Sequence, residues 1–106
     1  MIAVIFEVEP KSGHAPTYFD IAAELRPLVE QIDGFISIER FESVTQPGRF
    51  LSLSYWRDEA AIGEWRKHSS HQQAQDRGKS ELFRQYRIRV ANVVRDYGRG
   101  HDMQHD

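Results

Sequence analysis

The segment Phe50–His71, FLSLSYWRDEAAIGEWRKHSSH, constrains the fold most because its hydrophobic period changes along its length. Its first part alternates apolar residues with serines, a pattern typical of a β-strand. Its second part begins at Asp58, a residue type favoured at helix N-caps, and then spaces apolar residues three and four apart up to Trp65. The segment therefore predicts a strand that ends at Trp56 and passes almost directly into a helix.

The other elements follow from the same two periods. Thr17 and Asp20 resemble a capping box that opens a helix, Gly34 is predicted to end this helix, and Pro27 is expected to kink it. A second short helix is expected after a break near residues 69–70, running to 77–78. The predicted strands are 2–8, 35–43, 49–56 and 87–95. This order predicts an α+β, ferredoxin-like βαββαβ fold, with one antiparallel four-stranded sheet and helices on one face.

Composition bounds what such a chain can do. Its 106 residues are enough for one domain, placed at residues 1–97 with a flexible tail at 98–106. A net charge of −2 gives no pull towards nucleic acid or an anionic membrane. The absence of cysteine excludes disulfides and thiolate chemistry, and no apolar run is long enough to span a bilayer. A cytoplasmic protein is therefore expected.

The strand at 2–8 is apolar on both faces, which bears on assembly. With helices on only one face of the sheet, Ile2, Val4 and Phe6 would form a large exposed patch on the other face. Packing against a second copy would bury that patch. A homodimer that associates through the sheet face is therefore predicted.

The chain resembles the antibiotic biosynthesis monooxygenase (ABM) domain family in its length, its element order and two segments, DGFISIERFES and LSLSYWRDEAAIGEWRKHSSH. The resemblance covers residues 1–97 and implies a dimeric α+β barrel. It also implies oxidation of a small aromatic, phenol-like or quinol-like substrate by dioxygen in a pocket between sheet and helices, without a cofactor. A branch of this family degrades haem. Its Asn, Trp and His positions fall on Glu7, Trp65 and near Gln75, so only Trp65 matches; His71 or His68 would have to replace the iron ligand.

Three residues are catalytic candidates: Glu7, His71 and Trp65. If Glu7 points under the helices, its carboxylate needs a partner, and His71 or His68 could pair with it to remove a phenolic proton. The alternative is that Glu7 reaches solvent at a strand end. Trp65 could hold a flat substrate, or it could be a core residue.

Three further residues are substrate-binding candidates: His68, Arg84 and Tyr86. His68 and His71 have no evident third ligand, so no metal site is predicted. No phosphate loop or dinucleotide fingerprint is present, so neither nicotinamide nor flavin is expected. Two functions remain open: a monooxygenase, and a non-catalytic dimeric binding module on the same scaffold. A haem-binding variant is a third possibility.

Overall fold

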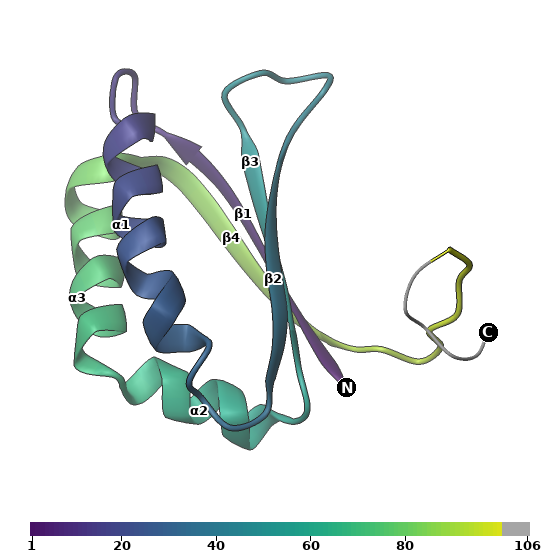
Figure 1. Ribbon diagram of the computed structural model, residues 1–106. Helices are drawn as coiled ribbons and strands as arrows, with labels where there is room; N and C mark the ends of the chain where they lie inside the picture. The colour runs from purple at the N-terminus through teal and green to yellow at the C-terminus, as the bar shows by residue number, and fades with distance from the viewer. Residues whose placement is uncertain (101–106) are drawn as a thin grey trace.

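The structure, a computed structural model, describes residues 1–100 (Figure 1). Its elements follow in the order β1 (Ile2–Pro10), α1 (Ala15–Val29), β2 (Phe35–Glu42), β3 (Phe50–Trp56), α2 (Glu59–Lys67), α3 (Ser69–Arg77), the π-helical turn η1 (Gly78–Leu82) and β4 (Phe83–Asn92). The four strands form one sheet in the order β2-β3-β1-β4, and every neighbouring pair is antiparallel. The helices lie together on one side of the sheet (Figure 1). The predicted ferredoxin-like α+β fold is therefore confirmed.

Several element ends differ from the prediction. α1 begins at Ala15 rather than behind a Thr17 capping box, because Pro16 sits in its first turn, where a missing N–H costs nothing. The same helix ends at Val29, soon after Pro27. Gly34 does adopt a positive φ, +95°, but it does so in the turn before β2 rather than at the helix end.

β4 begins at Phe83, four residues before its predicted start at residue 87, and ends at Asn92. It starts directly after η1, where Gly78 packs so closely on Phe83 that a Cβ at residue 78 would lie 2.5 Å from the ring. The chain beyond β4 runs away from the sheet, with Val94 and Tyr97 largely exposed (Figure 1). The domain boundary at residue 97 stays a prediction, and residues 101–106 of the predicted tail lie outside the described residues.

The buried core joins one end of the sheet to α2 and the end of α1. It contains Ile2, Val29, Trp56, Ala61 and Trp65. The indole N–H of Trp56 donates to Ser54 Oγ at 2.9 Å, so the polar atom of this buried ring is satisfied within the same strand.

The two faces of β1 are the reverse of what the dimer prediction assumed. Val4 and Phe6 line the space beneath the helices, and Ile2 belongs to the helix-side core, so these side chains do not form a bare patch. Strand alternation places Ile5 and Glu7 on the opposite face. There they lie beside Leu53 and Leu51 of β3, their register partners. This other face therefore combines partly buried apolar residues with the charged side chain of Glu7 and the arginines that pair with it.

Among the described residues 1–100, no helix has the length and apolar character needed to cross a bilayer.

Candidate functional site

A cavity of about 610 Å³ lies between the helices and the sheet. This volume is within the range of pockets that hold small organic molecules. The sheet contributes an apolar wall made by Val4 and Phe6 of β1 and by Ile88 and Val90 of β4. Ile88 and Val90 are 43% and 51% exposed, so the cavity is open to solvent along β4. An apolar molecule bound there would cover them.

Two buried serines explain why space remains under the helices. Ser52 and Ser54 of β3 line the cavity and are 8% and 6% exposed. Their short side chains face the helices, whereas Leu51, Leu53 and Tyr55 face the opposite side by alternation. Larger residues at the serine positions would fill the volume that the cavity occupies.

The junction between α2 and α3 positions the imidazole of His71. Asp58 caps α2 by accepting from the Ala61 N–H at 2.9 Å, and the helix stops at Lys67 because His68 is extended, with ψ of 127°. α3 then starts in a new direction. The ring of His71 stacks on Trp65, with centroids 4.8 Å apart, and both residues line the cavity.

His71 has an unusual electrostatic environment. Its Nδ1 atom is buried and has no hydrogen-bond partner among the described residues. Burial of the ring, followed by the charges of Arg66 and His68, lowers the pKa of His71 from 6.5 to about 4. The imidazole is therefore neutral at physiological pH, and its unpaired Nδ1 is free to accept a hydrogen bond from any donor that reaches it.

His68 has a structural role at the same junction. Its Nδ1 accepts from the backbone N–H of Ser70 at 3.3 Å and so caps α3. The break between the two helices therefore falls at His68 rather than near residues 69–70. Its ring lies 5.3 Å from that of Trp65, but His68 is not among the cavity-lining residues.

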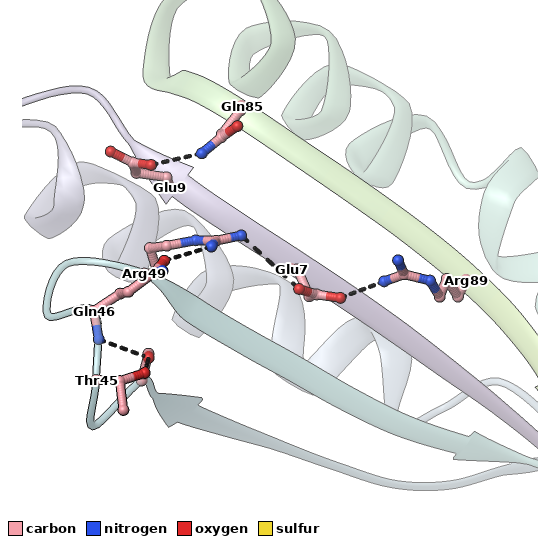
Figure 2. A network of polar contacts seen from close by, with 8 residues as sticks. Glu7, Glu9, Thr45, Gln46, Arg49, Gln85 and Arg89 are labelled. Carbon is pink, nitrogen blue, oxygen red and sulfur yellow. Dashed lines mark hydrogen bonds and ion pairs between the residues drawn. The ribbon is translucent and has the colours of Figure 1, made fainter.

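Glu7 lies on the face of the sheet that points away from the helices, so of the two orientations considered for it, the one beneath the helices is not observed. Its carboxylate accepts a short hydrogen bond from Arg89 and lies 3.9 Å from Arg49 (Figure 2). It lines a separate polar depression with these arginines rather than the cavity that contains His71. The predicted Glu7–His71 pair therefore does not form. Both faces of β1 are apolar, which left the orientation open in the sequence.

The two candidates on β4 separate. Tyr86 lines the cavity, with its ring 6.2 Å from that of Phe6. Arg84 does not line the cavity. It forms an ion pair with Glu9 at 3.4 Å instead.

Tyr18 and Arg40 are among the cavity residues that sequence reasoning did not single out. Tyr18 on α1 is 7% exposed, and its hydroxyl accepts from Arg40 Nε at 3.2 Å. Arg40 reaches the cavity because it continues the alternation of Ile38 on β2, and both residues line the cavity. An arginine in the inward-facing series of a strand was the available signal.

The residues present do not fit a haem site of the haem-degrading kind. Of the three corresponding positions, Trp65 and Gln75 line the cavity, but Gln75 supplies an amide where imidazole binds iron, and Glu7 is on the opposite face. Within residues 1–100 no three His, Asp or Glu side chains are grouped closely enough to hold a metal ion.

A ferredoxin-like sheet with a small-molecule cavity under its helices defines the general class of this protein. Residues 1–77 match the sequence profile of the family described as antibiotic biosynthesis monooxygenase, and the chain belongs to that family. Solved structures have the same fold. A candidate antibiotic biosynthesis monooxygenase from Deinococcus radiodurans superposes with a TM-score of 0.81 at 19% identity. The superposition covers 95% of this chain and 100% of that one. Rv0793 from Mycobacterium tuberculosis superposes over 92% and 98% of the two chains with a TM-score of 0.81 at 18% identity.

Two relatives are closer in sequence. The jasmonate monooxygenase ABM of Pyricularia oryzae is 44% identical over 94 residues, which cover 89% of this chain but only 44% of that protein. The uncharacterized protein YqjZ of Bacillus subtilis is 36% identical over 93 residues, covering 88% of this chain and 79% of YqjZ. This chain thus spans less than half the length of the first of these relatives.

Proposed function

We propose that the protein is a cofactor-independent monooxygenase that oxidises a small phenol-like or quinol-like substrate with dioxygen in the cavity between sheet and helices. The observation on which this rests is the buried, unpartnered Nδ1 of His71 at an otherwise largely apolar cavity. A buried polar atom without a partner is costly, and a hydroxyl group of a bound substrate would satisfy it.

His71 would act as the hydrogen-bond acceptor and base. With its proton on Nε2, Nδ1 accepts the phenolic hydroxyl of the substrate. The lowered pKa of His71 keeps it neutral before the substrate binds. As the substrate becomes an anion, its negative charge beside the imidazole raises the pKa of His71. The positive charge of Arg66, which also lines the cavity, stabilises the same anion.

Trp65 and Tyr86 would orient the ring. The indole of Trp65 packs on His71 and offers a flat surface next to the base.

The phenolate then transfers electrons to dioxygen, one oxygen atom forms a new C=O bond on the ring, and the other leaves as water. For a simple phenol the products are a quinone and one water, so the reaction balances without an external reductant. Accordingly no flavin, nicotinamide or metal is invoked.

The relatives support the reaction class. The family is described by monooxygenase activity, and the relative from Pyricularia oryzae is named a jasmonate monooxygenase. Its substrate is a property of that longer protein.

The protein is also proposed to act as a homodimer through the open face of the sheet. This face carries Ile5, Leu51, Leu53, Tyr55 and Phe41, of which Phe41 is 43% exposed. Pairing two such faces would bury the apolar patch and leave the helix-side cavity of each subunit accessible.

Oxygen uptake tests the proposed function. A panel of naphthols and hydroquinones is incubated with the protein in an oxygen electrode, and products are identified by mass spectrometry. Uptake that His71→Gln lowers by about 100-fold or more supports a base at this position. The matched control is His14→Gln, which changes a histidine at the start of α1 whose ring hydrogen-bonds the loop carbonyl of Ser12 and does not line the cavity. Tight binding of the same compounds without turnover would instead indicate the binding module.

A further inference from the structure

Arg40 is a cavity residue whose charge has no counter-ion among residues 1–100. The arginines at positions 26, 49, 57, 77, 84 and 89 each lie within 4.0 Å of a carboxylate oxygen. Within the described residues 1–100, Arg40 has no such carboxylate. Its neighbours are the Tyr18 hydroxyl, which accepts from Nε at 3.2 Å, and the rings of Tyr18 and Phe19, whose centroids lie 5.2 and 5.9 Å from its guanidinium carbon.

These contacts orient Arg40. Its two terminal guanidinium nitrogens have no hydrogen-bond partner within residues 1–100. A guanidinium binds a carboxylate through two parallel N–H groups, and the pair of terminal nitrogens provides that geometry. Stacking on aromatic rings holds the guanidinium plane in place, so less conformational entropy is lost when an anion binds.

The cavity as a whole is cationic, although the chain has a net charge of −2. Its lining includes four cationic residues, Arg26, Arg40, Arg66 and Lys79, and one acidic residue, Glu39. Glu39 lies between Ile38 and Arg40 on β2, so by alternation its side chain points to the opposite face of the sheet. Arg26 is neutralised by Glu30, 3.8 Å away, whereas Arg66 has no carboxylate within 4.0 Å among the described residues.

The rest of the lining is apolar. The wall formed by Phe6, Ile88 and Val90 suits a hydrocarbon or aromatic body, and about 610 Å³ accommodates a small molecule rather than a polymer. An apolar wall combined with one oriented guanidinium is complementary to an amphipathic acid. Phosphate sites usually add backbone N–H groups from a glycine-rich loop, a feature that the sequence lacks.

We propose that the substrate of this cavity is an aromatic or otherwise apolar molecule that carries a carboxylate, and that Arg40 binds this carboxylate. The proposal rests on the proposed function because it treats the cavity as the substrate site. It adds a second anchoring point to the hydrogen bond that His71 accepts from the substrate hydroxyl group. Arg40 is thus a substrate-binding residue that selects acids over neutral molecules of the same shape.

Calorimetric binding of matched acids and esters tests this proposal. The probes are 6-hydroxy-2-naphthoate and 3-(4-hydroxyphenyl)propanoate, each compared with its methyl ester, which has the same apolar body without the charge. The wild-type protein is expected to bind at least one acid about tenfold or more tightly than its ester, as a hydrogen-bonded charge pair predicts. Arg40→Gln is expected to abolish this preference, and Arg40→Lys to retain part of it.

Arg49→Gln is the matched control, because it removes the same charge from the opposite face of the sheet, where Arg49 lies beside Glu7. It is expected to leave the acid preference intact. Equal binding of both acids and their esters by the wild-type protein, or binding of neither, would overturn the proposal, even if Arg40→Gln does not fold. An unchanged preference in folded Arg40→Gln would overturn it as well.

The two proposals fail in different measurements. If acids bind preferentially but no bound phenol consumes oxygen, the substrate class survives and the monooxygenase activity does not. If esters and acids are oxidised and bound equally well, the activity survives and the role of Arg40 does not.

Discussion

The rings of Trp65 and His71 lie 4.8 Å apart, centroid to centroid, with 33° between their planes. The two residues belong to different helices, α2 and α3, and come together because the chain changes direction at His68. A continuous helix would separate residues six apart by about 9 Å along its axis and place them on different faces. The break therefore creates the contact, and with it the only pairing of an imidazole and a large aromatic surface that the cavity has among the described residues.

The buried imidazole predicts a pH dependence of folding stability. The pKa of His71 is about 4 in the folded chain and about 6.5 when unfolded. The unfolded chain therefore binds more protons between these values, so the free energy of unfolding should fall as the pH is lowered from 6.5 to 4 and level off below. The contribution of His71 to the free energy of unfolding is on the order of 2 kcal/mol, because solvent that reaches part of the ring weakens the effect of burial. Urea denaturation from pH 4 to 7.5 measures it.

His71→Gln provides the comparison for this pH series, because glutamine does not titrate. The stability of this variant should decline less steeply over the same interval, while the contributions of carboxylates common to both proteins cancel. Parallel profiles for the wild type and the variant would contradict the assignment of the lowered pKa to His71.

Gly34 predicts a steric effect on stability. Its φ is +95°, and an added Cβ would lie 2.7 Å from the Cβ of Ala61 on α2. Gly34→Ala should therefore combine backbone strain with overpacking and lower the free energy of unfolding by roughly 2–4 kcal/mol. Gly48→Ala isolates the strain, because Gly48 has φ of +92° and no atom within 4 Å of an added Cβ. It should cost about 1 kcal/mol. Equal losses in thermal denaturation would show that the contact with Ala61 relaxes.

The position of Glu7 predicts that its charge is dispensable for the cavity. Its side chain is 38% exposed and pairs with Arg89 and Arg49 on the opposite face (Figure 2). Glu7→Gln should leave oxygen uptake and probe binding unchanged and alter the free energy of unfolding by less than about 1 kcal/mol, as for exposed ion pairs. Loss of uptake with intact folding would instead restore Glu7 as a catalytic candidate.

The open face of the sheet predicts the effect of a buried charge on assembly. Leu53→Glu places a carboxylate in the centre of the proposed subunit contact, where it would be desolvated without a partner, so the protein should sediment as a single subunit. Val44→Glu is the control, since Val44 is 94% exposed in the β2–β3 turn. A wild-type protein that already sediments as a single subunit at micromolar concentration would refute the dimer.

The fold was largely predictable because strand and helix periods are written directly into the segments 50–56 and 59–67. What failed was the choice of face for β1, whose two sides are both apolar. In β3, Ser52 and Ser54 rather than the leucines beside them turn towards the helices, so apolar character alone does not identify the inward face of this sheet. The reason is that this interior is a cavity with a partly polar floor rather than a packed core.

The site was predictable in part for the same reason. His71, Trp65 and Tyr86 were identified because each is a chemically distinctive residue on the second half of the chain, and all three line the cavity. Glu7 and Arg84 were not distinguishable from cavity residues until the strand register was known. Arg40 was overlooked because its proposed role depends on the lack of a nearby carboxylate in the described part of the chain, which is a property of three-dimensional surroundings rather than of sequence.

The short extended link at His68 also makes the site sensitive to chain length. One extra residue in the first turn of α3 would rotate every following side chain by about 100° around the helix axis. The imidazole of His71 would then swing away from Trp65 while α3 itself stayed helical. A single-codon insertion could thus remove the stacked His71–Trp65 pair, and the base role proposed for His71, without replacing either residue.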